Sequence, residues 1–178
     1  QGVASWEIMY EDSLGNPEIL LWLKEINCKW NFSPCHFAAK VGNIELMGLL
    51  KDNGFPWSKT DCVIAVDGGH FNMLKFLRNP GQGRRPSPWC KHVCISAIKQ
   101  NYFDILKWAV KNGCPTGNNK EIYKEAVGCE RFAMIEWLME NGIGVDLDAI
   151  IEAARTPKMV DFLEKLFEKS IPDLTDFD

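Results

Sequence analysis

Met73-Leu74-Lys75-Phe76-Leu77 carries apolar residues at its first, second, fourth and fifth positions. Residues with this spacing lie on one face of a helix of period 3.6. Five further segments share the pattern: Ile19-Leu20-Leu21-Trp22-Leu23, Leu46-Met47-Gly48-Leu49-Leu50, Ile105-Leu106-Lys107-Trp108-Ala109, Met134-Ile135-Glu136-Trp137-Leu138 and Met159-Val160-Asp161-Phe162-Leu163. Successive copies are displaced by 27, 27, 32, 29 and 25 residues. A nearly fixed period predicts a repeat architecture.

The sequence after each pattern predicts the end of a helix. Asn53-Gly54, Asn112-Gly113 and Asn141-Gly142 follow three of the copies. A glycine there adopts the left-handed conformation that closes a helix at no steric cost. Proline-containing connections come next, at Pro56-Trp57, Pro88-Trp89 and Cys114-Pro115. Because proline does not continue a helix, these segments are predicted to be loops.

A second predicted helix precedes each pattern. Its copies align at a small residue: Ala38, Ala65, Ala97 and Ala126. A small residue in the middle of a helix allows a neighbouring helix to approach closely. Ser33-Pro34 and Ser87-Pro88 both have the form of an N-cap serine followed by a first-turn proline. Tight corners separate the two helices, at Gly15-Asn16-Pro17, Gly42-Asn43, Gly69-His70 and Gln100-Asn101.

Two helices of about ten residues do not bury their apolar faces alone, so neighbouring repeats must stack. We therefore expect an all-α solenoid of about six helix-turn-helix repeats. It forms one repeat domain over residues 1–170, and residues 171–178 form an acidic C-terminal tail. The tryptophans inside the pattern, Trp22, Trp108 and Trp137, are expected in the core.

The corner and second-helix segments resemble those of ankyrin repeats. Gly69-His70-Phe71-Asn72-Met73-Leu74-Lys75-Phe76-Leu77 is similar to the "G-H-x-x-x-[VL]-[KE]-x-L" stretch of that family, and the aligned alanines match its central alanine. Phe103 to Pro115 is close to the units of a divergent ankyrin class found in large DNA viruses, oomycetes and protists. The resemblance covers roughly residues 3 to 169.

The resemblance has three departures from the usual ankyrin unit. The "T-P-L-H" opening is represented only by Ser33-Pro34-Cys35-His36. The corner Gly128-Cys129-Glu130-Arg131 is atypical. The common spacing of 27 residues is also shorter than the ankyrin norm of about 33. We expect the missing residues to come from the β-hairpin fingers, which are then short loops or absent. The resemblance implies that His36 ties neighbouring repeats together and that His70 forms hydrogen bonds at its corner.

Composition narrows the class of function. A net charge of −4 and a pI near 5.5 disfavour a nucleic-acid binder, because such proteins carry a basic stripe. No apolar run reaches the eighteen or so residues that span a bilayer. The seven cysteines fit no short disulfide framework and mostly lie in apolar helical segments, which indicates a cytoplasmic, reducing setting.

Cys90, His92 and Cys94 form the one set of residues with metal-ligand chemistry. On a helix, Cys90 and Cys94 share a face, but His92 points about 160° away from them. Zinc requires four converging ligands, so buried structural cysteines are the preferred interpretation and a zinc-containing protein is the lesser alternative. No phosphate-binding loop, dinucleotide fingerprint or nucleophile motif is present, so we expect no enzyme and no cofactor.

Residues 79–88 form the main irregularity, since they lengthen one period. Insertions in solenoids map to loops on one face, often the binding face. Arg84-Arg85-Pro86-Ser87 also resembles a phosphorylation site of basophilic kinases, so this loop is either a contact or phosphorylation loop or a tolerated insertion. Trp57 and Trp89 are expected to pack between adjacent repeats, with partner contact as the alternative.

We therefore expect a non-enzymatic scaffold that binds a partner protein as a monomer through its concave and loop surfaces. Polar residues of the first helices are candidates for that contact: Lys40, Asp61, Asp67, Lys91, Lys99 and Lys124. The loops add the arginines Arg84 and Arg85 and the tryptophans Trp57 and Trp89. The alternative is a structural spacer or assembly segment of a larger protein, for example a viral one.

Overall fold

A computed structural model describes residues 16–26, 33–81, 83–117, 119–144, 150–151 and 153–170. Every regular element in these ranges is a helix, and none of them contains a strand, as the periodicity predicts. None of these helices is long and apolar enough to cross a membrane. Most of the first expected repeat's upstream segment and the tail 171–178 lie outside the described residues. The chain divides into two compact units, Gln1–Cys90 and Lys91–Asp178.

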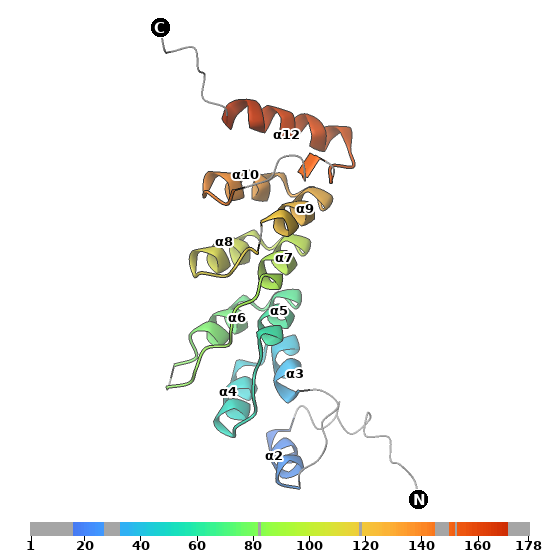
Figure 1. Ribbon diagram of the computed structural model, residues 1–178. Coiled ribbons are helices and arrows are strands. Elements are labelled where there is room, and N and C mark those ends of the chain that lie inside the picture. The colour runs from blue at the N-terminus through green and yellow to red at the C-terminus, as the bar shows by residue number, and fades with distance from the viewer. Residues whose placement is uncertain are drawn as a thin grey trace, which may run out of the picture. The chain divides into compact units, whose positions relative to one another are not determined.

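The first unit contains α2 (Pro17–Glu25), α3 (Pro34–Val41), α4 (Ile44–Asp52), α5 (Lys59–Asp67) and α6 (Phe71–Arg78). Consecutive helices pair, α3 with α4 and α5 with α6 (Figure 1). The first helices of the two pairs, α3 and α5, also pack together, and α4 packs against both α2 and α6. Residues 53–58 join α4 to α5 without a strand, so the expected finger is a short loop here.

The second unit contains α7 (His92–Lys99), α8 (Phe103–Lys111), α9 (Lys120–Gly128), α10 (Phe132–Glu140) and α12 (Pro157–Ser170). Its helices follow the same plan: α7 pairs with α8, α9 pairs with α10, and α7 packs against α9 (Figure 1). At the carboxyl-terminal end of the unit, α10 packs against α12.

The core of each unit lies between the helices of a pair and between neighbouring first helices. Four alanines that align in the sequence have no exposed surface: Ala38, Ala65, Ala97 and Ala126. Cys35, Cys62 and Cys94 are also fully buried on the first helices. They serve there as small apolar residues, and burial raises the pKa of the Cys35 and Cys62 thiols to about 11.

The prediction that the patterned tryptophans are core residues is wrong. Trp22 is 53% exposed, and Trp108 and Trp137 are only half-buried. At about 100° per residue the first, second and fifth positions of the pattern lie within about 100° of one another, whereas the fourth lies about 60° outside that arc. The fourth position is therefore the edge of the apolar stripe.

These edge aromatics connect neighbouring second helices. Trp137 on α10 meets Phe103 on α8 edge to face, with ring centroids 6.2 Å apart. Phe162 on α12 meets Phe132 on α10 in the same way at 4.9 Å. Such pairs favour association beyond their buried area. In this unit the first residue of one second helix thus packs against the fourth pattern position of the next.

A single left-handed residue turns the chain between the two helices of each pair. Gly42 and Gly69 have φ of 71° and 73°, and Asn101 and Glu130 have φ of 62° and 54°. The atypical corner before α10 therefore makes the same turn with a glutamate. Left-handed residues also follow the second helices at Gly54, Gly113 and Gly142, as predicted.

The residue after the corner reaches back to the preceding first helix. His70 Nε2 lies 2.9 Å from the carbonyl oxygen of Lys40, at the end of α3. Arg131 donates to the carbonyl oxygens of Ile98 and Lys99, at the end of α7, at 3.0 and 2.9 Å. The last carbonyls of a helix have no partner within it. These contacts provide one for the carbonyls of Lys40 and Lys99, whereas the Ile98 carbonyl also accepts from the Asn101 amide. They join consecutive pairs rather than closing the corner itself.

The two predicted serine caps have different outcomes. Ser33 is the N-cap of α3, with Pro34 in its first turn. Ser87 is not an N-cap, because α7 begins at His92 with Lys91 before it. Residues 84–90 instead form a loop without regular secondary structure, and Ser87 is fully buried within it.

We predict that Gly42→Ala lowers the free energy of unfolding of the first unit by about 2–3 kcal/mol. The left-handed conformation costs about 1–2 kcal/mol without glycine. A Cβ on Gly42 would also lie 2.6 Å from the His70 ring. Urea denaturation followed by circular dichroism measures the change.

Two matched variants separate the causes. Gly83 has φ of 69° and open space where a Cβ would stand, so Gly83→Ala should cost only about 1 kcal/mol. Gly68 lacks positive φ, but its Cβ would lie 2.6 Å from the same ring. Equal losses for Gly42→Ala and Gly83→Ala would contradict the role of the His70 ring.

Candidate functional site

An open groove lies on the first-helix face of the second unit. Its volume is about 560 Å³, and it is lined by His92, Ile95 and Lys99 of α7, by Glu121, Lys124, Glu125 and Gly128 of α9, and by Cys129 and Arg155. We call it the α7–α9 groove. The predicted contact residues Lys99 and Lys124 line it, and Lys91 precedes α7 beside it.

Two ion pairs cross between α7 and α9. Lys91 Nζ lies 2.8 and 2.7 Å from the two carboxylate oxygens of Glu121. The hydrogen bond from Lys91 lowers the pKa of the Glu121 carboxyl below its ordinary value. Lys99 Nζ lies 3.6 Å from Glu125, which also accepts from the Cys129 thiol at 3.5 Å. The lysines of one first helix thus neutralise the glutamates of the next.

Positive charge remains in the groove after these pairs are counted. Lys124 and Arg155 are exposed, and within the described residues neither lies within ion-pair distance of a carboxylate. His92 is also exposed at the start of α7. Arg155 and His92 were not among the predicted partner-contact residues, and His92 was considered only as a potential metal ligand. Arg155 lies outside the predicted helices, and the sequence carries no signal that brings it to α9.

On the first unit, some of the predicted contact residues are exposed and one is buried. Lys40 and Asp67 are exposed on α3 and α5. Asp61 has no exposed surface, so its prediction as a partner contact is wrong. It occupies the third position of α5 and closes a capping box with Ser58. The S/T-x-x-D spacing of residues 58–61 was the sequence signal for this role.

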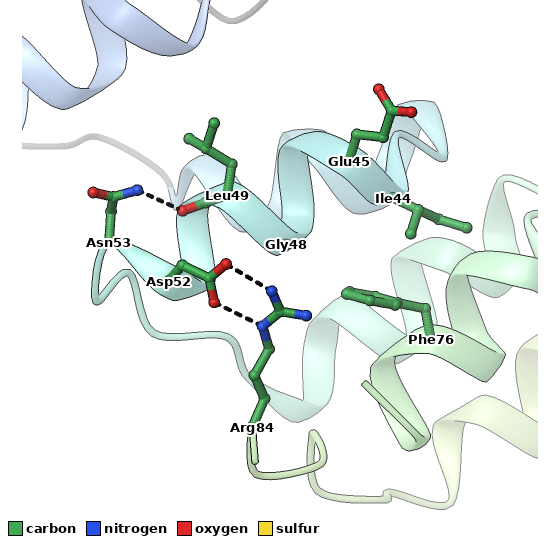
Figure 2. Close-up of a pocket in the computed structure, with 8 residues that line it drawn as sticks. All are labelled: Ile44, Glu45, Gly48, Leu49, Asp52, Asn53, Phe76 and Arg84. Atoms are coloured by element: carbon green, nitrogen blue, oxygen red, sulfur yellow. Dashed lines mark hydrogen bonds and ion pairs between the residues drawn. The ribbon is translucent and has the colours of Figure 1, made fainter. Parts of the chain in front are cut away.

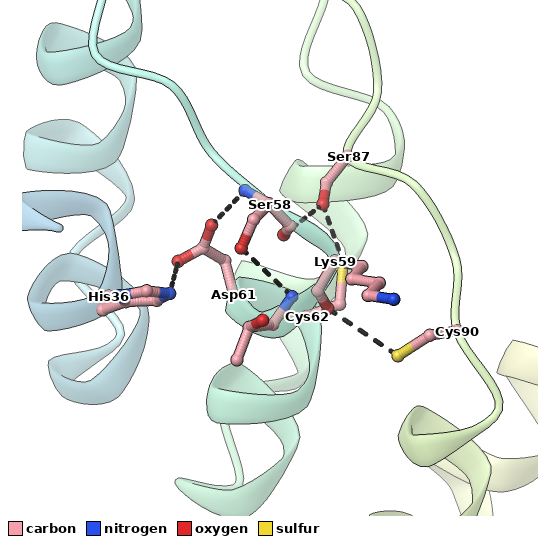
Figure 3. A network of polar contacts seen from close by, with 8 residues as sticks. His36, Ser58, Lys59, Asp61, Cys62, Ser87 and Cys90 are labelled. Atoms are coloured by element: carbon pink, nitrogen blue, oxygen red, sulfur yellow. Dashed lines mark hydrogen bonds and ion pairs between the residues drawn. The ribbon is translucent and has the colours of Figure 1, made fainter.

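Figure 3 shows the polar network around this cap. Asp61 accepts from the Ser58 backbone amide, and its other oxygen lies 3.6 Å from Nε2 of His36 on α3. His36 therefore connects two consecutive helix pairs, as the resemblance implied. Burial raises the pKa of the Asp61 carboxyl above its ordinary value, although the Ser58 amide and His36 oppose that shift.

Ser87 belongs to the same network. Its hydroxyl donates to the Ser58 carbonyl at 2.8 Å and accepts from the Cys62 thiol at 3.4 Å (Figure 3). Its backbone amide donates to Leu77, and its carbonyl accepts from Arg78. A buried hydroxyl with these partners is not presented to a kinase, so the structure does not support the phosphorylation interpretation.

Arg84 binds the first unit's own surface. Its Nε and Nη2 donate to the two carboxylate oxygens of Asp52 at 2.8 and 2.6 Å (Figure 2). Its Nη1 donates to the carbonyl oxygen of Pro80 at 3.2 Å. The hydrogen bond from Arg84 lowers the pKa of Asp52. Arg84 is therefore engaged in holding the loop against α4, whereas Arg85 is exposed.

Gly48 lies on α4 next to the Arg84 side chain. It occupies the third pattern position, where α6 and α8 have Lys75 and Lys107, each lying over an aromatic ring of its own helix. A Cβ on Gly48 would lie 3.7 Å from Phe76 and 3.8 Å from Arg84. A groove of about 430 Å³ lies at this point (Figure 2). It is lined by Ile44, Glu45, Gly48, Leu49, Asp52, Asn53, Phe76 and Arg84. A Cβ would fit here at ordinary contact distance, whereas a side chain as long as lysine would compete with Arg84 for the surface of α4.

The loop tryptophans pack within the first unit. Trp57 is 8% exposed; its ring meets Phe76 of α6 edge to face at 6.2 Å, and the Lys51 ammonium lies 4.6 Å from its centroid. Trp89 is half-buried under the guanidinium of Arg78 at 4.3 Å. The structure therefore confirms the packing interpretation for Trp57.

The three residues with metal-ligand chemistry do not converge. Cys90 precedes α7 and its thiol faces the Lys59 carbonyl at 3.9 Å, whereas Cys94 is buried and His92 is exposed. The assumption that Cys90 and Cys94 share a helix is wrong, because α7 begins after Cys90. In the described ranges no group of three or more potential ligands could hold a metal ion.

We predict a pH dependence at Asp61. A carboxyl whose pKa is raised in the folded state stabilises that state below its unfolded value of 3.8, and this contribution is lost as pH rises through the raised folded value. Asn keeps an acceptor for Ser58 but does not titrate. Between pH 4 and 7 the wild type should therefore lose more stability than Asp61→Asn in urea denaturation.

Glu45→Gln is the control for this comparison, because Glu45 is an exposed carboxylate in the same unit. Its pH profile should parallel that of the wild type. Parallel profiles for the wild type and Asp61→Asn would contradict the assignment.

We also predict that Arg84→Ala releases the loop. The variant lacks the hydrogen bonds to Asp52 and Pro80, so the amides of Arg84's neighbours and of Ser87 should exchange with deuterium several-fold faster, as measured by mass spectrometry. Arg85→Ala is the matched control and should leave exchange unchanged. Equal exchange in the two variants would show that Arg84 does not hold the loop.

Comparison with known proteins gives no match to a family model, to a curated protein sequence or to a solved structure. The functional interpretation therefore depends on the geometry of the chain itself.

Proposed function

We propose that this chain is a non-enzymatic protein-interaction module, built as an ankyrin-like array of helix pairs, that binds a partner protein through its first-helix face. The observation that carries the proposal is the α7–α9 groove. Its ion pairs lie side by side across two helices and leave Lys124 and Arg155 exposed at one place. A preformed surface of this kind loses little conformational entropy when it binds.

The residue types that most often act in catalysis have structural contacts in the first unit, which supports a non-enzymatic role. His36, Asp61, Cys62 and Ser87 belong to the network that caps α5 and attaches the loop. Burial raises the pKa of the Cys62 thiol to about 11, which keeps it protonated and poorly nucleophilic. These residues hold helices together. We further propose that the module acts as a monomer inside the cell and needs no cofactor.

We predict that the partner depends on the first-helix face. The double variant with Lys99→Ala and Lys124→Ala should recover about tenfold less of a stoichiometric partner than the wild type. This corresponds to a loss of about 1.4 kcal/mol in the free energy of binding. Quantitative mass spectrometry after affinity capture of the full chain measures this.

Lys111→Ala/Lys165→Ala is the matched control, because both lysines are exposed on second-helix elements of the same unit. It should retain the partner. Recovery of no stoichiometric partner, or equal recovery by both double variants, would favour a structural spacer instead.

A further inference from the structure

The α7–α9 groove combines surplus positive charge with room for an apolar side chain. Both of its described carboxylates already have cations: Glu121 holds Lys91, and Glu125 holds Lys99. Lys124 and Arg155 are exposed and have no carboxylate within ion-pair distance among the described residues. A ligand that neutralises them therefore displaces no internal ion pair.

Ile95 is the one aliphatic side chain among the residues that line the groove, and the surface beside it at Gly128 is open. Ile95 is half-buried on α7, and Gly128 ends α9 with nothing within 4 Å of the place where a Cβ would stand. The fold itself therefore has no steric need for glycine at this position. An apolar side chain from outside can lie against Ile95 over Gly128 without displacing a residue of the chain.

We propose that the groove binds an acidic segment of the partner protein, with two carboxylates flanking an apolar side chain; this rests on the proposed function. One carboxylate pairs with Arg155, whose guanidinium offers two parallel donors, and the other pairs with Lys124. The apolar side chain lies on Ile95.

The preference for an acidic ligand depends on the groove and not on the charge of the whole chain. The chain carries a net charge of −4, so its overall field does not attract an acidic ligand. Selectivity for acidic segments must come from the groove. Binding is then expected to weaken as salt screens the exposed pairs.

The test uses a short fluorescein-labelled peptide of alternating glutamate and leucine, with a glutamine–leucine peptide as its match. Fluorescence anisotropy on the full chain should show binding of the first peptide and at least about tenfold weaker binding of the second. Lys124→Glu and Arg155→Glu should each weaken the glutamate peptide by about tenfold or more. Lys111→Glu, an exposed lysine of α8, should have no effect.

Gly128→Leu provides a variant that fills the groove without removing charge. It should leave the urea denaturation midpoint unchanged or raised, because the site is open and leucine favours helix. It should nevertheless weaken the peptide by about tenfold. Equal binding of the two peptides, or full binding by Gly128→Leu, overturns the proposal.

The acidic segment 171–178 of this chain is the competing occupant. A variant with Asp173→Asn, Asp176→Asn and Asp178→Asn should bind the glutamate peptide as the wild type does. Tighter binding by about tenfold would assign the groove to that segment and overturn the partner assignment. If the peptide results fail while the cellular partner still depends on Lys99 and Lys124, the proposed function stands and only the acidic chemistry is wrong.

Discussion

The two helices of each pair are eight or nine residues long, and one residue with left-handed backbone joins them. That residue is Gly42, Gly69, Asn101 or Glu130. Helices of that length are marginal in water, and their stability comes from the packing of an apolar face. The corner folds the second helix back onto the first. It also places the following side chain, His70 or Arg131, on the carbonyl end of the preceding first helix. Each pair therefore stabilises the one before it within its unit.

The periodic apolar pattern was sufficient to predict the helices, the corners and the buried alanines, because each depends on local spacing. It was insufficient for Trp22 and Trp137. How far a residue at the edge of an apolar stripe is covered depends on the neighbouring helix, as Phe103 partly covers Trp137. Such a contact joins residues 34 positions apart, which no local pattern reports.

The candidate site was only partly predictable for the same reason. Lys99 and Lys124 follow from their positions on the first helices, but the ion pairs that leave Lys124 unneutralised depend on which glutamate lies opposite each lysine. Asp61 and Ser87 show the reverse case. Their polar character suggested a surface, whereas a capping box and a docked loop bury them. The Arg84 side chain lies beside Gly48, 36 positions earlier in the chain, and no local pattern predicts that contact.

The most direct test of the claim that this chain is an interaction module is site-specific photo-crosslinking in cells. A benzoylphenylalanine at Ile95, in the α7–α9 groove, should give one stoichiometric crosslinked partner. The same residue at Glu140, exposed at the end of α10, should give none. No crosslink from Ile95, or the same products from both positions, would contradict the account.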